Sequence, residues 1–184
     1  MHIYPEKTQA IMIDMQEKLL AAMPDPEGLV RRTGILISGL SVLGVPVTVT
    51  QQYTKGLGKT DGRLMQACGT EEYYDKITYS CWEDDHIREA VSALPERKTV
   101  LLFGVETHVC VWQTARDLLE NGYDVQIVCD CVESRKTIDK ETAFRRMEQA
   151  GAVLTTVEAC LFDMLKTAGT PEFKAVSKLV KQLF

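Results

Sequence analysis

Short runs of apolar and β-branched residues recur along the chain, and longer stretches with helical periodicity separate them. One such stretch places apolar side chains three or four positions apart between Leu29 and Leu43, and another does so between Val111 and Leu119. Strand patterns that alternate with helix patterns are typical of a parallel sheet with helices on both faces. The runs that predict strands are residues 9–14, 45–50, 99–104, 124–129 and 152–156. We therefore expect an α/β fold: a three-layer α-β-α, Rossmann-like, doubly wound sheet with about five or six mainly parallel strands.

Two segments interrupt this alternation. Residues 53–79 combine weak periodicity with many polar residues and glycines, which indicates a long excursion over the carboxyl edge of the sheet, where long loops commonly serve a site. Residues 171–184 begin with a proline and place Phe173, Val176 and Val180 on one helical face. That helix either closes the core or packs on a neighbouring subunit. No repeat or interdomain linker divides the chain, so residues 1–184 are expected to form one domain.

Composition narrows the classes of function. The chain has 184 residues, of which 45% are hydrophobic and 26% are charged, and its formal net charge is -5. Charges of both signs are interspersed, so we expect no nucleic-acid partner. No apolar stretch approaches the ~18 residues of a membrane span and no secretory signal pattern opens the sequence, so we expect a cytoplasmic protein without a membrane partner. In a reducing compartment the six cysteines remain free thiols.

The residues that follow the apolar runs are the first to examine for chemistry, because open α/β sheets bind ligands at the carboxyl ends of their strands. Asp14 ends the first run and is either a general base or an N-cap or turn residue before the next helix. Cys110 follows the third run where helical periodicity begins, and a helix N-terminus lowers the pKa of a thiol and favours a nucleophilic thiolate. The alternative for Cys110 is a small core residue. Lys76 lies in the polar excursion and either supplies a cation to these groups or is solvated.

Three segments resemble those of a known family. IMIDMQEKLL contains Asp14, DKITYSCW contains Lys76, and LLFGVETHVCVWQTARDLLENGYDVQIVCDCVESR contains Cys110. Over nearly the whole chain the sequence resembles the isochorismatase-like cysteine hydrolases, which include nicotinamidases, and most of all their isochorismatase-domain-containing subgroup. The resemblance implies a catalytic triad of Asp14, Lys76 and Cys110, and a homo-oligomer. It also implies a cis peptide bond between Val105 and Glu106, and an oxyanion hole formed by the backbone N–H groups of Glu106 and Cys110.

In that interpretation Asp14 accepts the proton of Cys110, the thiolate attacks a carbonyl or amidine-like carbon of a small-molecule substrate, and water hydrolyses the covalent intermediate. Nicotinamidases hold a metal with an Asp-x-His pair and a further histidine, whereas this chain has Gln51, Gln52 and Tyr53 after the second predicted strand. No metal or other cofactor is therefore expected. The resulting hypothesis is a metal-independent cysteine hydrolase that acts on a C–N bond of an amide- or ureide-type compound.

Two other functions stay open at this point. One is a binding or scaffold protein that keeps the hydrolase fold without turnover. The other is an isochorismatase-type ether hydrolase, which does not need the thiol.

Three further residues are candidates for a substrate pocket. Gln16 follows Asp14 by two positions, and Tyr53 and Trp82 flank the excursion. Hydrogen bonding and stacking by these groups suit a small planar substrate, and packing in the core or at a rim is the alternative for each. His108 lies two residues before the thiol. Because Asp14 already fills the role of base, we expect a structural role for His108.

Overall fold

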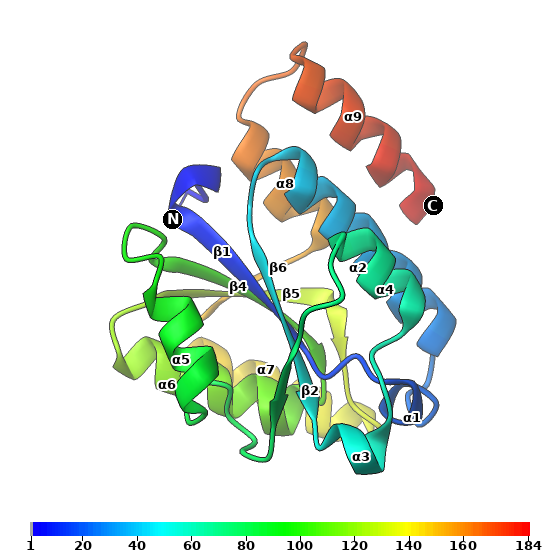
Figure 1. Cartoon of the computed structure of the whole chain (residues 1–184). Coiled ribbons are helices and arrows are strands. Elements are labelled where there is room, and N and C mark those ends of the chain that lie inside the picture. Colours follow the sequence, from blue (N-terminus) through cyan, green and yellow to red (C-terminus); the bar gives the residue numbers. More distant parts are fainter. Residues whose placement is uncertain (1) are drawn as a thin grey trace.

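A six-stranded parallel sheet forms the centre of the computed structural model, which describes residues 2–184 (Figure 1). The strand order is β3-β2-β1-β4-β5-β6, and every neighbouring pair is parallel. The strands are β1 (Thr8–Ile13), β2 (Val47–Gln52), β3 (Tyr74–Lys76), β4 (Thr99–Val105), β5 (Asp124–Glu133) and β6 (Val153–Thr155). The predicted doubly wound α/β fold is confirmed.

Helices cover both faces of this sheet. Helices α2 (Pro26–Val42), α4 (Gly62–Cys68), α8 (Val157–Leu165) and α9 (Pro171–Val180) lie on one side, and α5 (Asp85–Ser92), α6 (Trp112–Glu120) and α7 (Thr137–Ala150) lie on the other (Figure 1). The shorter elements are α1 (Glu17–Leu20), α3 (Thr54–Leu57), the 3-10 turns η1 (Pro5–Lys7) and η3 (Lys181–Leu183), and the π-helical turn η2 (Thr107–Val111). Across residues 2–184, none of the helices has the length and apolar character needed to cross a bilayer.

The switch in strand order places the carboxyl ends of β1 and β4 side by side. β1 pairs with β2 on one side and with β4 on the other. The chain therefore continues from β1 toward one edge of the sheet and from β4 toward the other edge. Open α/β sheets bind ligands at such a switch point. Asp14 directly follows β1, and η2 with Cys110 follows β4, so the fold brings two of the predicted catalytic residues to one place.

The excursion contains more regular structure than expected. Besides α3 and α4, it holds β3, which pairs with β2 from Thr50↔Tyr74 to Gln52↔Lys76 and forms an edge of the sheet. Because this strand is short, polar and at the edge, it has no apolar run from which it could have been predicted. The sequence-based description of residues 53–79 as a loop is therefore wrong in this part.

Two further differences concern the second half of the chain. β5 continues to Glu133 instead of ending at 129, because its register against β4 shifts between Leu102 and Gly104 and pairing then resumes. Helix α9 packs against α2 and α8, and its Val176 and Val180 are buried. Of the two expectations for the last helix, closing the core is therefore the one that the structure supports.

Gly104 allows β4 and β1 to approach each other closely beside the switch point. Its φ is +123°, and a Cβ at this position would lie 2.0 Å from the carbonyl oxygen of Ile13. Both the conformation and the space therefore require a glycine.

We predict that Gly104→Ala destabilises the protein by about 2–4 kcal/mol, because the new methyl group meets backbone that cannot move without disturbing the sheet. Urea unfolding followed by circular dichroism measures the change. Gly62→Ala is the matched control, since a Cβ at Gly62 has no atom within 4 Å. Equal unfolding midpoints for the two variants would contradict the prediction.

Candidate active site

The carboxylate of Asp14 is completely buried at the end of β1. The residue has a φ of 52°, a left-handed conformation that residues other than glycine rarely adopt and that is often found at functional sites. Its Oδ2 accepts from Lys76 Nζ and its Oδ1 accepts from the Thr50 hydroxyl, each at 2.8 Å. Helix α1 has Gln16 at its N-cap. The alternative interpretation of Asp14 as a helix cap is therefore wrong.

Lys76 extends from the edge strand β3 into the same buried space, and its side chain is 0% exposed. Besides Asp14, Nζ meets Gln52 Oε1 at 2.6 Å and the carbonyl oxygens of Thr78 and Tyr79 at 3.2 and 3.3 Å. Burial is the largest single influence and would lower the pKa of Lys76, but the charge and hydrogen bond of Asp14 together with the neighbouring Cys81 and Cys110 outweigh it, and the pKa is raised. The ammonium group is thus held in its charged form, and the alternative of a solvated lysine is wrong.

Cys110 lies in the π-helical turn η2 and is 7% exposed. Burial is the largest cause that raises the pKa of its thiol, the carboxylate of Asp14 raises it further, and Lys76 acts in the opposite direction. The expectation that a helix N-terminus lowers this pKa is therefore wrong for the resting site, because desolvation and a nearby anion raise the pKa. The raised pKa keeps the resting thiol neutral, near the carboxylate of Asp14.

The peptide bond between Val105 and Glu106 is cis, as the resemblance implied. The side chain of Glu106 pairs with Arg135: Oε1 accepts from Nε at 2.9 Å and Oε2 accepts from Nη2 at 3.2 Å. Burial would raise the pKa of Glu106, but the hydrogen bonds and charge of Arg135 lower it overall. This ion pair ties the backbone that precedes η2 to the segment that follows β5.

Two of the predicted pocket residues have structural contacts of their own. Gln16 is buried, and its amide donates to the carbonyl oxygens of Gln52 at 3.0 Å and Gly58 at 2.7 Å, while its Oε1 accepts from the backbone N–H of Gln52 at 2.7 Å. These contacts hold the excursion against the end of β2. Trp82 stacks edge-to-face on Tyr123, with ring centroids 5.4 Å apart. Tyr123 directly precedes β5, so this contact joins the segment after β3 to the start of β5, and a pocket role for Trp82 stays a prediction.

Tyr53 is the predicted pocket residue that stays accessible, with 52% of its surface exposed. It directly follows β2 at the carboxyl edge, and its φ is 41°. Its ring lies over Gly56, where a Cβ would come within 2.3 Å of the ring carbon Cε1. Tyr53 therefore lies at the exposed carboxyl edge of the sheet, where Gln52 ends β2 and Lys76 ends β3.

Two polar contacts of the site were not predicted from the sequence. Thr50 and Gln52 lie on β2 and meet Asp14 and Lys76, respectively. The signal that could have found them is the polar run that ends the second predicted strand, where a buried threonine and a glutamine replace the expected apolar residues.

His108 contacts a segment outside its own turn, and the cysteines are unpaired. His108 Nδ1 lies 2.9 Å from Ser134 Oγ and joins η2 to the segment after β5. All six cysteines are free thiols. Within the described range 2–184, no group of three or more histidine, cysteine or acidic side chains is arranged to hold a metal ion.

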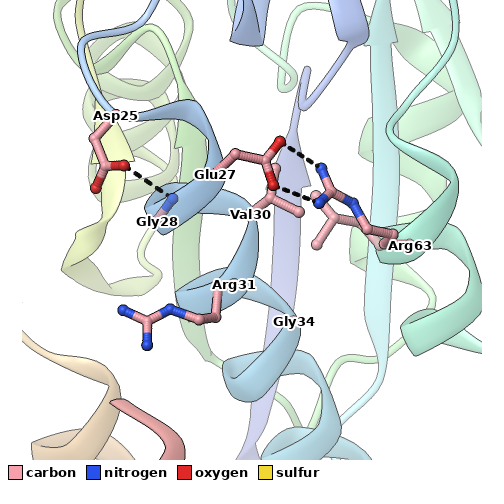
Figure 2. Close-up of a pocket in the computed structure, with 8 residues that line it drawn as sticks. Asp25, Glu27, Gly28, Val30, Arg31, Gly34 and Arg63 are labelled. Atoms are coloured by element: carbon pink, nitrogen blue, oxygen red, sulfur yellow. Dashed lines mark hydrogen bonds and ion pairs between the residues drawn. The ribbon is translucent and has the colours of Figure 1, made fainter. Parts of the chain in front are cut away.

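A separate hollow of about 660 Å³ lies between α2 and α4 (Figure 2). Gly28 and Gly34 leave room on its α2 wall, and Glu27 crosses it to pair with Arg63 at 2.7 and 3.2 Å. None of its lining residues belongs to the cluster of Asp14, Lys76 and Cys110. We therefore treat it as a surface feature distinct from the candidate active site.

Comparisons with known proteins agree with this architecture. Residues 8–159 match the family model described as "Isochorismatase domain". A secreted isochorismatase effector, Isc1, from Phytophthora sojae is 36% identical over 98% of this chain and 87% of its own length. The isochorismatase domain-containing protein 1 of Salmo salar is 35% identical over 98% of this chain, which spans 63% of that relative.

Solved structures extend the likeness to three dimensions. The MAR1 ribonuclease of Caenorhabditis elegans is 37% identical, with a TM-score of 0.90 over 98% of this chain and 93% of that one. The YcaC gene product of Escherichia coli, described as an octameric hydrolase of unknown specificity, has a TM-score of 0.88 over 100% of this chain and 89% of its own, at 23% identity. At that identity the second likeness concerns the fold alone.

The contacts of Lys76 generate a prediction about stability. Lys76→Met should destabilise the protein at pH 8 by about 3–5 kcal/mol, because it leaves the buried carboxylate of Asp14 without its cation. The folded protein raises the pKa of Lys76 above its ordinary value of 10.5, so this stabilisation is complete below that pH and is lost as the pH rises through the higher folded value. The difference in the free energy of unfolding between wild type and Lys76→Met should therefore become smaller in strongly alkaline solution.

Urea unfolding at pH 8 and pH 11, with a reducing agent present, measures the gap. Lys55→Met is the control, since Lys55 is exposed. A Lys76→Met variant that unfolds at the same urea concentration as this control at pH 8 would refute the prediction.

Proposed function

The chain belongs to the isochorismatase family, and we propose that it is a metal-independent cysteine hydrolase that cleaves a C–N bond in a small amide- or ureide-type molecule. The observation that carries the proposal is the set of contacts around Asp14. One oxygen of this buried carboxylate meets the ammonium of Lys76 at 2.8 Å, and the charge of the same carboxylate raises the pKa of the Cys110 thiol, which places the thiol within range of it. A base beside a neutral thiol is the arrangement that nucleophilic catalysis requires.

In the proposed reaction, Asp14 removes the thiol proton and the sulfur of Cys110 bonds to the carbonyl carbon. The oxyanion that forms is stabilised by the backbone N–H groups of Glu106 and Cys110. When the C–N bond breaks, the leaving nitrogen takes the proton from Asp14, and a thioester remains on the enzyme. Water then attacks the thioester, Asp14 accepts a proton from it, and the acid product leaves while the proton returns to the sulfur.

Lys76 balances charge during these steps. In the resting site its ammonium faces one carboxylate and one neutral thiol. After proton transfer it faces a neutral carboxylic acid and a thiolate, so the number of charges within the buried cluster does not change. Moving a proton inside such a cluster costs less than creating a new buried charge.

A turnover experiment tests the assignment. We expect that a panel of small amides and ureides, assayed by ammonia release, contains a compound that the wild-type protein hydrolyses and that Cys110→Ala does not, with loss of at least about 10³-fold because the nucleophile is gone. Cys68→Ala is the control, since Cys68 is a half-buried thiol outside the cluster. Circular dichroism verifies that both variants are folded.

Three results would redirect the assignment. Absence of turnover for every compound would favour a binding or scaffold protein, and turnover of an enol ether retained in Cys110→Ala would favour an isochorismatase-type ether hydrolase. A single-stranded RNA is included because the related Caenorhabditis elegans protein is described as a ribonuclease. RNA cleavage that Cys110→Ala abolishes would replace the C–N assignment, although a net charge of -5 does not favour a polyanionic substrate.

We also propose that the protein is a cytoplasmic homo-oligomer. Six free thiols suit a reducing compartment, and the Escherichia coli protein with the same fold is described as octameric. Ile77 and Tyr79, beside the candidate site, expose 82% and 57% of their surface. We predict a mass well above the 20.6 kDa of one chain in size-exclusion chromatography with light scattering. A single species of monomer mass at micromolar concentration would refute the oligomer.

A further inference from the structure

Thr50 holds Asp14 through both its backbone and its side chain. It is completely buried on β2, beside the end of β1. Its carbonyl oxygen accepts from the backbone N–H of Asp14 at 3.2 Å, and its hydroxyl donates to Oδ1 of the same residue at 2.8 Å. Asp14 is therefore attached to the neighbouring strand at two points.

The other neighbours of the Thr50 hydroxyl leave its proton for Asp14. The carbonyl oxygen of Met12 is an acceptor, but it lies at 3.5 Å, where a hydrogen bond is weak. The sulfur of Cys81 lies at 3.9 Å and donates to the hydroxyl oxygen. Burial raises the pKa of the Cys81 thiol to about 11, so this sulfur keeps its proton near neutral pH and remains a donor.

Together with Lys76, this hydroxyl fixes the plane of the carboxylate. Lys76 binds Oδ2 and Thr50 binds Oδ1, so rotation about the Cβ–Cγ bond of Asp14 would break both contacts. A general base acts efficiently only when a lone pair stays directed at the proton that it removes. Without the Thr50 hydroxyl, Oδ1 of Asp14 would lack the hydrogen bond that resists this rotation.

We propose that Thr50 is a positioning residue of this active site: its hydroxyl holds the Asp14 carboxylate in the orientation that accepts the proton of Cys110. This inference rests on the proposed function, because it requires Asp14 to be the base. It adds to the triad a residue that acts through its hydrogen bond to Asp14.

Alkylation of Cys110 by iodoacetamide tests the inference without a known substrate. The reagent reacts with the thiolate, and mass spectrometry of peptides gives the rate for each cysteine separately. Thr50→Val removes the hydroxyl but keeps the shape of the side chain, and Thr50→Ser keeps the hydroxyl. Thr48→Val is the matched control, since Thr48 lies two residues earlier on the same strand and the same face of the sheet.

At neutral pH we expect Thr50→Val to alkylate at Cys110 about tenfold more slowly than wild type, which corresponds to about 1.4 kcal/mol, within the range for one hydrogen bond to a charged group. Thr50→Ser should recover most of the rate, and Thr48→Val should match wild type. The deficit should shrink as the pH rises, because hydroxide then removes the thiol proton without help from Asp14.

Loosening of the fold gives a different signature. Cys131 and Cys160 are buried, so partial unfolding raises their labelling together with that of Cys110 at every pH. The deciding quantity is therefore the rate at Cys110 relative to Cys160 in the same molecule, as a function of pH. The inference is supported if Thr50→Val lowers this ratio at neutral pH and Thr50→Ser restores it. This holds even if Thr50→Val is less stable than wild type.

Asp14→Asn separates this inference from the proposed function. Hydrolysis is the readout for Asp14→Asn, because loss of its charge also lowers the Cys110 pKa. If Asp14→Asn abolishes hydrolysis of the compound found in the panel, and Thr50→Val leaves hydrolysis and alkylation unchanged, the positioning role is overturned and the base assignment stands. If Asp14→Asn retains hydrolysis, the assignment of Asp14 as base fails, and the role of Thr50 fails with it.

Discussion

A buried ion pair between Lys76 and Asp14 is the interaction on which the arrangement of the carboxyl edge depends. Removing an ion from water costs several kcal/mol of desolvation free energy. In a buried pair this cost must be offset by the attraction between the two ions and by further hydrogen bonds. These hydrogen bonds come from Gln52, from Thr50 and from two carbonyl oxygens after β3. These partners belong to β1, β2, β3 and the following loop, so satisfying one pair of charges fixes how four segments meet.

The same pair influences the protonation state of Cys110, the proposed nucleophile. Burial and the carboxylate of Asp14 keep Cys110 protonated at rest, although it lies where a helix begins. Reactivity in such a site depends on proton transfer inside the cluster, not on a standing population of thiolate. Lys76 makes that transfer tolerable, because its ammonium faces one negative charge both before and after the proton moves. In the proposed reaction, Asp14 and Lys76 therefore activate the thiol without a histidine or a metal.

Topology brings the participants together. Because β1 pairs with β2 on one side and with β4 on the other, the residues that follow β1 and β4 share one crevice. Gly104 lets β4 lie close to Ile13, and the register shift after Leu102 lets β5 continue to Glu133. Arg135 then follows β5 closely enough to hold Glu106, so a change in strand pairing supports the backbone that leads to Cys110.

The sequence by itself determined the alternation of strands and helices, the parallel sheet and the positions of Asp14 and Cys110, because apolar periodicity and the ends of buried strands are local properties. The resemblance of three segments to a known family identified Lys76, which spacing alone left as one of many lysines. Only the tertiary structure decided that Trp82 stacks on Tyr123, that Gln16 binds backbone and that Thr50 binds Asp14. It also reversed the expected direction of the thiol pKa. These properties depend on burial and on contacts between distant segments, and neither quantity is contained in the order of residues within one strand or helix.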